Sequence, residues 1–227
     1  MKLILCSLLA VFTVTVTASA DVIIVTAPPG LNPGDHYRLA FVTGQTINGS
    51  APDINTYNLF VTNRANLAPA LVALGTTWRI IGSTTAVSAK VNTGTDPSLS
   101  TGVPIYGLDG TKIVDNNADL WDGSLDSTIN VTEAGKLGGH EVWTGTNITG
   151  DGDPTYELGA TSGLTRVGRI VTNDGWIYGI TPLNQYQDPV YALSGDLTVA
   201  PEPSSALLLA TGLVLPLLLR MRRISAV

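Results

Sequence analysis

The chain has 227 residues, of which only 13% are charged, and a formal net charge of −6 at pH 7. An acidic chain repels the phosphates of nucleic acids and the anionic groups of sulfated or acidic polysaccharides, so we expect no nucleic-acid partner. Its single cysteine, Cys6, excludes an intramolecular disulfide and a cysteine-based metal site.

The first 20 residues have the three parts of a secretory signal peptide. Lys2 supplies a positive charge, an apolar run spans residues 3–16, and Ala18 and Ala20 form an A-x-A cleavage site. We therefore expect the chain to cross the inner membrane through the Sec translocon and to be cut before Asp21. Cleavage there leaves a mature protein without any thiol.

Residues 21–199 form the body of the protein, and their number suits one domain with a sizeable hydrophobic core. All 18 acidic residues but only eight of the 12 basic residues lie between Asp21 and Pro203, because Lys2 and three C-terminal arginines fall outside. The body therefore has a net charge of about −10, which the solubility of an exported protein explains.

Two strands are expected at the start of the body. Residues 21–26 are rich in β-branched side chains and are followed by two proline-glycine turn signals. In residues 36–42, Tyr37, Leu39 and Phe41 alternate along the chain and so share one face. This alternation predicts a strand with a buried aromatic face.

One amphipathic helix follows. Asp53 is placed to cap its N-terminus, and Pro69 lies just beyond its expected end near residue 66. Apolar residues recur at spacings of three and four, as expected for one buried side: Ile54, Tyr57, Val61, Ala65 and Ala68.

Short elements joined by polar loops are expected in the rest of the body. Extended segments are predicted at residues 78–81, 103–106, 141–146, 175–178 and 190–193, the last two as closing strands. A single helical turn is predicted in residues 119–125, ended by Gly123. Many short strands and one clear helix predict an α+β fold, with an all-β sandwich as the alternative.

Six short motifs also follow one another in the body. They are Y-R-L-A-F-V-T at residues 37–43, R-A-N at 64–66, G-T-T-W-R-I-I-G-S at 75–83, V-P-I-Y at 103–106, L-W-D-G-S at 120–124 and V-W-T-G-T at 142–146. Their order resembles that of the collagen endostatin domain, a relative of the C-type-lectin-like fold, over roughly residues 37–195. The resemblance implies a single domain of that architecture. That family's cysteines, zinc-binding histidines and basic heparin-binding surface have no counterpart here, so no functional residue is implied.

The two histidines offer no complete catalytic or metal site. His36 follows Asp35, but no G-x-S-x-G motif supplies a nucleophile. His140 has no partner at the spacing of metal ligands. We therefore expect a non-enzymatic protein.

Carboxylate pairs leave one enzymatic alternative open, a secreted hydrolase with a carboxylate or metal site that the sequence does not reveal. Asp119 with Asp122, or Glu133 with Glu141, would be the acid and base of a glycosidase. Spacing along the chain does not establish the separation that such a reaction needs.

A calcium site is the one cofactor that the acidic residues suggest. Asp115, Asn117 and Asp119 match the first three ligand positions of a D-x-N-x-D calcium loop. Leu120 then stands where an EF-hand needs glycine, and Asp126 stands where it needs a bidentate glutamate. The pattern is half complete, and these residues are also common turn formers, so no bound cofactor is expected.

Residues 200–227 form a tail of three parts. They are the motif Pro201-Glu202-Pro203, an apolar run, and a basic stop at Arg220, Arg222 and Arg223. The prolines keep a helix from crossing the motif, so a transmembrane helix is expected at about residues 204–219. Its rise of roughly 24 Å is slightly short of the ~30 Å hydrocarbon core, and the arginines predict a cytoplasmic C-terminus.

This tail resembles the PEP-CTERM sorting signal of exported Gram-negative proteins, in which an exosortase is thought to cut near the Pro-Glu-Pro motif. The resemblance implies an exosortase-type membrane enzyme as partner, transient anchoring in the inner membrane, and delivery to the cell surface or extracellular matrix. We therefore expect a structural or carbohydrate-binding domain, with exopolysaccharide as a further partner.

Overall fold

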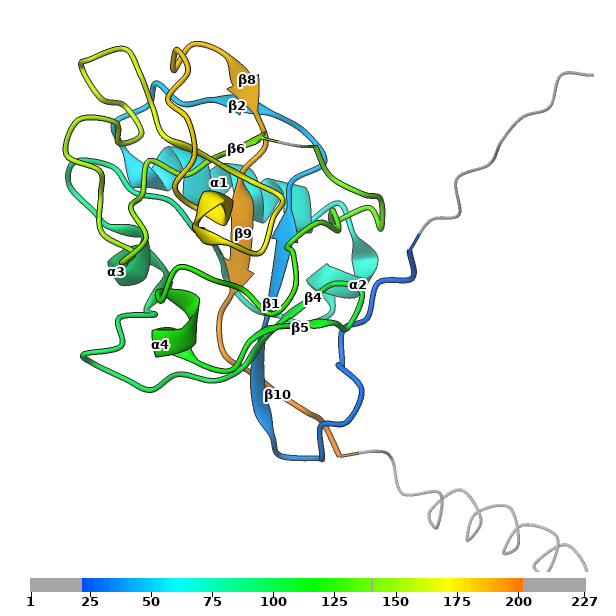
Figure 1. The fold of residues 1–227 in the computed structure, drawn as a ribbon. Coiled ribbons are helices and arrows are strands. Elements are labelled where there is room, and N and C mark those ends of the chain that lie inside the picture. Colours follow the sequence, from blue (N-terminus) through cyan, green and yellow to red (C-terminus); the bar gives the residue numbers. More distant parts are fainter. Residues whose placement is uncertain (1–21, 140, 202–227) are drawn as a thin grey trace, which may run out of the picture.

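A computed structural model of the protein describes residues 22–139 and 141–201 and has a mixed α+β fold (Figure 1). Its helices are α1 (Ile54–Ala65), α2 (Pro69–Val72), α3 (Ala89–Thr93), α4 (Asn117–Leu120) and the 3-10 helix η1 (Asp174–Trp176). Its strands are β1 (His36–Val42), β2 (Ile47–Asn48), β3 (Trp78–Ile80), β4 (Ile105–Gly107), β5 (Lys112–Val114), β6 (Glu141–Trp143), β7 (Val167–Arg169), β8 (Gln187–Asp188), β9 (Tyr191–Ser194) and β10 (Leu197–Thr198). The predicted α+β class is confirmed, and the all-β alternative is wrong because a 12-residue helix packs on the main sheet.

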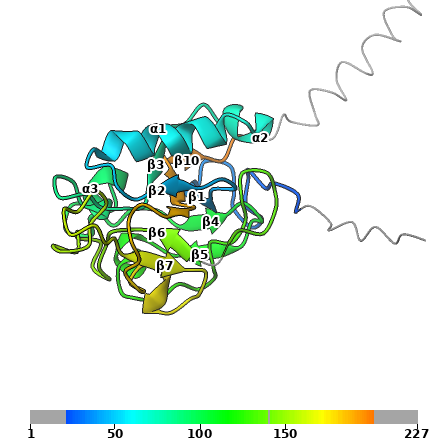
Figure 2. The same ribbon diagram turned by 90° about the horizontal axis from the view of Figure 1, so that it is seen from above.

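Strand β1 lies at the centre of the main sheet, whose order is β3-β9-β1-β4-β5. β4 pairs with β1 in parallel, whereas β9 and β10 pair with it antiparallel. Helices α1 and α2 lie on one side of this sheet, and the antiparallel pair β6 and β7 lies on the other (Figure 2). The sheet is thus the middle layer of the fold.

One half of the core lies between this sheet and α1. Tyr37, Leu39 and Phe41 are buried there, as the alternation in the sequence predicted. The rings of Phe41 and Trp78 meet edge to face, with their centroids 5.0 Å apart, which is a favoured aromatic geometry.

The other half of the core covers the opposite face of β1, so this strand is buried on both faces. Ala40 and Val42 belong to this half. Trp121 and Trp176 stack nearby with centroids 6.0 Å apart. The sequence predicted one buried face only, because it does not show which distant loops cover the other.

Helix α1 agrees with its prediction in its boundaries and its buried side. The Asp53 carboxylate accepts a hydrogen bond from the backbone N–H of Asn55 at 2.9 Å, which satisfies one free donor of the first turn. The helix ends at Ala65, and Asn66 is its C-cap. A polar residue on the buried side, Asn58, accepts from the backbone N–H of Ile80 at 3.1 Å and so joins α1 to β3.

Three predictions of local structure were wrong. Residues 22–25 belong to no strand, because only isolated backbone bonds such as Val22 N–H to Gly135 O hold them. Residues 175–178 are not a strand, since the Asn173 side chain accepts from Gly175 N–H and begins η1. The helical turn α4 begins at residue 117 rather than 119, because Asn116 caps it.

Strand β9 was predicted, but its place in the sheet was not. It pairs with β3 on one edge and with β1 on the other, so it is an inner strand and not a closing one. Its partners are more than 100 residues away in the chain, a distance over which local patterns carry no pairing information.

The expected signal peptide, with Ala18 and Ala20, lies outside the residues that the structure describes. So do Glu202, Pro203, the predicted transmembrane helix at 204–219 and the arginines at 220, 222 and 223. Within residues 22–139 and 141–201, no helix has the length and apolar character needed to cross a membrane.

We predict that Tyr57 makes the stability of the fold sensitive to alkaline pH. Burial raises the pKa of its hydroxyl to about 12. An unfolded tyrosine ionises near pH 10, so the stabilisation is complete below about pH 10 and is lost as the pH rises towards 12. Between pH 9 and pH 11, Tyr57→Phe should therefore lose about 1 kcal/mol less unfolding free energy than the wild type. Urea unfolding followed by tryptophan fluorescence measures this.

The readout is the change in unfolding free energy with pH, not its absolute value, because the Tyr57→Phe variant also loses the hydrogen bond from Ala51 N–H at every pH. Tyr186→Phe is the matched control, since that ring is 54% exposed and makes no comparable packing contacts. The same slope in Tyr57→Phe and in the wild type would refute the prediction.

Candidate functional site

A cleft of about 790 Å³ opens beside the main sheet. Its walls come from β1, the first turn of α1, β3, α3, the loop before β4 and the connection from β9 to β10. A volume of this size is within the range of small-molecule sites, which are recognised by a few convergent polar groups. The polar groups of this cleft therefore decide what it can bind.

Arg38 is a buried cation that lines the cleft. It lies on β1 between two core residues and is only 8% exposed. Its Nε donates to the carbonyl of Ser194 at 2.6 Å, and its Nη2 donates to the carbonyl of Thr93 at 2.9 Å. These bonds use two of the five N–H groups of a guanidinium.

Three N–H groups of Arg38 remain, two on Nη1 and one on Nη2. Nη1 donates to no acceptor among the described residues, and it is not sealed from solvent. Burial lowers the pKa of Arg38 to about 10, while the charge of Asp196 raises it. The side chain is therefore cationic at neutral pH, and no described carboxylate lies within 4.0 Å of it.

Asn117 supplies an acceptor to the same cleft. It is the first residue of α4 and is 2% exposed. Its Nδ2 donates to the carbonyl of Ser100 at 2.9 Å, which leaves Oδ1 without a donor among the described residues. Gly102 keeps the space beside this oxygen open, since a β carbon there would lie 2.1 Å from Oδ1.

Exposed polar residues form the rim. Arg79 on β3 and Asn55 in the first turn of α1 line the cleft, and Arg79 forms no ion pair within the described part of the chain. Asp196 also lines the cleft, and its Oδ1 lies 3.2 Å from Nδ1 of His36. Two arginines and one aspartate leave the cleft locally positive in an acidic protein.

His36 has a carboxylate partner from the connection between β9 and β10. It lies next to Asp196, whereas the carboxylate of its chain neighbour Asp35 accepts from Asn32 N–H. In residues 22–139 and 141–201, no hydroxyl is hydrogen-bonded to His36, so these residues form no Ser-His-Asp arrangement. His140 lies outside the described residues.

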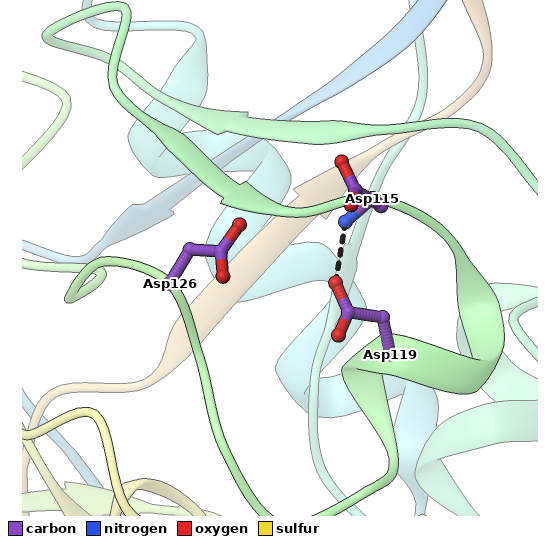
Figure 3. Close-up of side chains that lie close together, drawn as sticks. All are labelled: Asp115, Asp119 and Asp126. Atoms are coloured by element: carbon purple, nitrogen blue, oxygen red, sulfur yellow. Dashed lines mark hydrogen bonds between the residues drawn. The ribbon is translucent and has the colours of Figure 1, made fainter.

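The three weak calcium candidates from the sequence, Asp115, Asn117 and Asp119, divide between two places. Asp115 and Asp119 come together with Asp126, and one carboxylate oxygen of each lies within 4.8 Å of the others (Figure 3). Asp119 also accepts from the backbone N–H of Asp115 at 2.6 Å. Asn117 lines the cleft instead, because the start of α4 places its side chain against Ser100.

A lysine already serves as the cation of this acidic cluster. Nζ of Lys112 lies 2.5 Å from Asp115 Oδ1 and 3.1 Å from Asp126 Oδ2. Hydrogen bonds to Asp115 and Asp126 raise the pKa of Lys112. Lys112 thus offsets one of the three negative charges of the cluster.

The carboxylates considered for a glycosidase have separate structural partners. Glu133 is 1% exposed, pairs with Arg64 through a bond from Nε of 2.8 Å, and accepts from Gly44 N–H at 2.8 Å. Glu141 lies 3.9 Å from Arg169. Asp122 accepts from Ser124 in its own turn.

All four tryptophans are buried, which weakens the case for sugar stacking on an aromatic platform. Trp78, Trp121, Trp143 and Trp176 are each at most 6% exposed. No aromatic side chain is among the described residues that line the cleft. Any saccharide bound there is held by hydrogen bonds and charge.

A comparison with known proteins does not extend this picture, since no family model matches the chain and no curated protein sequence matches it.

The sequence did not point to Arg38, although it held one signal. The residue interrupts an otherwise apolar run, Tyr37 to Val42, that was correctly predicted to be a strand. A lone cation in such a run is either exposed or buried with partners. Its partners are backbone carbonyls at residues 93 and 194, which no side-chain pattern reveals.

We predict that Lys112 limits calcium binding at the acidic cluster. Replacing its ammonium in Lys112→Met leaves three carboxylates without their cation, so 1 mM calcium should raise the melting temperature of this variant by ~3 °C or more. The wild type should shift by less than ~1 °C. Differential scanning calorimetry with calcium or EGTA measures both. Lys136→Met, outside the cluster, is the control, and equal shifts in Lys112→Met and wild type would contradict the prediction.

Proposed function

We propose that the protein is an exported, non-enzymatic surface or extracellular-matrix protein that binds saccharide in the cleft beside Arg38. Exosortase-type processing of its PEP-CTERM-like tail would deliver it there after Sec-dependent export. The observation that carries the binding part is the set of unused hydrogen-bonding atoms on two buried side chains, Arg38 Nη1 and Asn117 Oδ1.

Neither of these two atoms has a hydrogen-bond partner among the described residues, and neither is sealed from solvent. Two side chains that are more than nine-tenths buried, line one cleft and keep a free donor and a free acceptor are typical of binding sites. A saccharide suits them, since each of its hydroxyl groups both donates and accepts. Asn55 and Arg79 at the rim would add further polar contacts.

The tail follows the body with almost no linker. β10 ends at Thr198, and the exposed Pro201 begins the Pro-Glu-Pro motif only three residues later. We infer that a processing enzyme would meet this motif at the surface of the folded body. An endostatin-like or C-type-lectin-like architecture is part of the same proposal, supported by the order of the short motifs around β1, α1 and β3.

We predict that the mature protein begins at Asp21 and ends near Pro203. Purification from a Gram-negative host that carries an exosortase, followed by intact mass spectrometry, would measure both ends. Deleting the exosortase should leave the C-terminal residues on the chain. Recovery of residues 220–227 in the mature protein from the normal host would exclude cleavage and favour a permanent anchor.

We predict that the exported protein binds saccharides on a glycan array, and that Thr77→Trp abolishes this binding. Thr77 is exposed and lines the cleft, so an indole there would fill it. Thr161→Trp is the matched control, because Thr161 is also exposed and is not part of the cleft. Absence of binding by the wild type, with and without calcium, would refute the proposal. A glycosidase activity lost on mutating Asp119 or Glu141 would support the hydrolase alternative instead.

A further inference from the structure

We propose that the saccharide taken by the cleft carries a carboxylate, as a uronic acid unit does, and that this carboxylate binds the free edge of Arg38. The inference rests on the proposed saccharide binding and narrows it to one chemical class. It also runs against the expectation from net charge, which disfavours acidic polysaccharide.

The geometry of Arg38 is the first support. Its Nε and one Nη2 hydrogen are held by the carbonyls of Ser194 and Thr93, which fixes the plane of the guanidinium. Both Nη1 hydrogens and one Nη2 hydrogen have no acceptor among the described residues, so neighbouring donors on Nη1 and Nη2 remain for a ligand. Two parallel donors match the two oxygens of a carboxylate, and such bidentate pairs are stronger and more directional than neutral hydrogen bonds.

The charge around Arg38 is the second support. No described carboxylate forms an ion pair with it, and Asp196 is instead in contact with His36. A buried cation without a direct counter-ion is costly, and an incoming carboxylate would supply that counter-ion. Burial lowers the pKa of Arg38, as expected for a desolvated cation of this kind.

Asn117 distinguishes an acidic sugar from a simple anion. Its free Oδ1 accepts a hydrogen bond, and a carboxylate or phosphate alone has few or no protons to donate at neutral pH. A uronic acid carries hydroxyl groups on the same ring as its carboxylate. It therefore supplies an acceptor for Arg38 and a donor for Asn117 in one unit.

The net charge of the protein does not prevent this binding. At about 0.15 M salt the Debye length is about 8 Å, so charges farther away are largely screened. Within the cleft the ligand meets Arg38 and Arg79 against the single carboxylate of Asp196. The local charge is thus favourable where the global charge is not.

The test compares two ligands that differ only in the carboxylates. The exported protein is titrated by calorimetry with a galacturonate trisaccharide and with its fully methyl-esterified form. We expect the acid to bind at least ~10-fold more tightly, because charge-assisted hydrogen bonds are lost in the ester. Equal binding of both forms would overturn this inference and leave saccharide binding intact. Binding of neither form nor of any neutral saccharide would overturn both.

Substitutions of the two cleft arginines test which side chain binds the carboxylate of the ligand. Arg38→Lys keeps the charge but removes the second parallel donor, so it should reduce the preference for the acid over the ester. Arg79→Gln at the exposed rim should weaken binding of the acid by a few-fold more than binding of the ester, and it tests the charge even if Arg38→Lys fails to fold. Arg169→Gln, a surface arginine outside the cleft, is the control. Tighter binding of a peptide with a free C-terminal carboxylate than of galacturonate would overturn the assignment to a saccharide.

Discussion

The pairing of β1 with β4 on one edge and with β9 on the other is the constraint on which the rest of the structure depends. A strand that is hydrogen-bonded along both edges and buried on both faces constrains the positions of the elements packed against it. Helix α1 covers one face, and the tryptophan-rich loops cover the other. Because no disulfide is available to a chain whose only cysteine is Cys6, this double burial has to hold the domain together by packing and backbone hydrogen bonds alone.

The position of Arg38 follows from the same constraint. Residues that flank it point into the core, and the strand cannot turn to expose one side chain without exposing its neighbours. The guanidinium is therefore fixed where carbonyls of α3 and β9 converge. A charged side chain in an apolar strand departs from the usual pattern, and such departures are most often found at functional sites. A rigid strand also positions a functional side chain more accurately than a loop does.

The sequence predicted those features whose cause is local. Helix α1 was found because its cap at Asp53 and its apolar spacing lie within a dozen residues. The segment around Trp176 was misread as a strand, because aromatic and β-branched residues suit a strand and the turn set by Asn173 was overlooked. Asn117 was grouped with Asp115 by spacing, yet the first turn of α4 carries its side chain to the cleft. The cleft itself joins segments from residue 38 to residue 196 and has no signature in any single stretch.

The inner position of β9 has a consequence for the order of events during the proposed export. The strand ends at Ser194, yet it fills the place between β3 and β1. If the chain is exported as proposed, β1 and β3 cannot be joined until that part of it has crossed the membrane, and contacts between distant residues form slowly. The sheet would therefore stay unformed until almost the whole polypeptide has crossed the membrane. Under that proposal, folding would be completed outside, within a few residues of the Pro-Glu-Pro motif, so one late strand would couple completion of the domain to arrival of the proposed sorting tail.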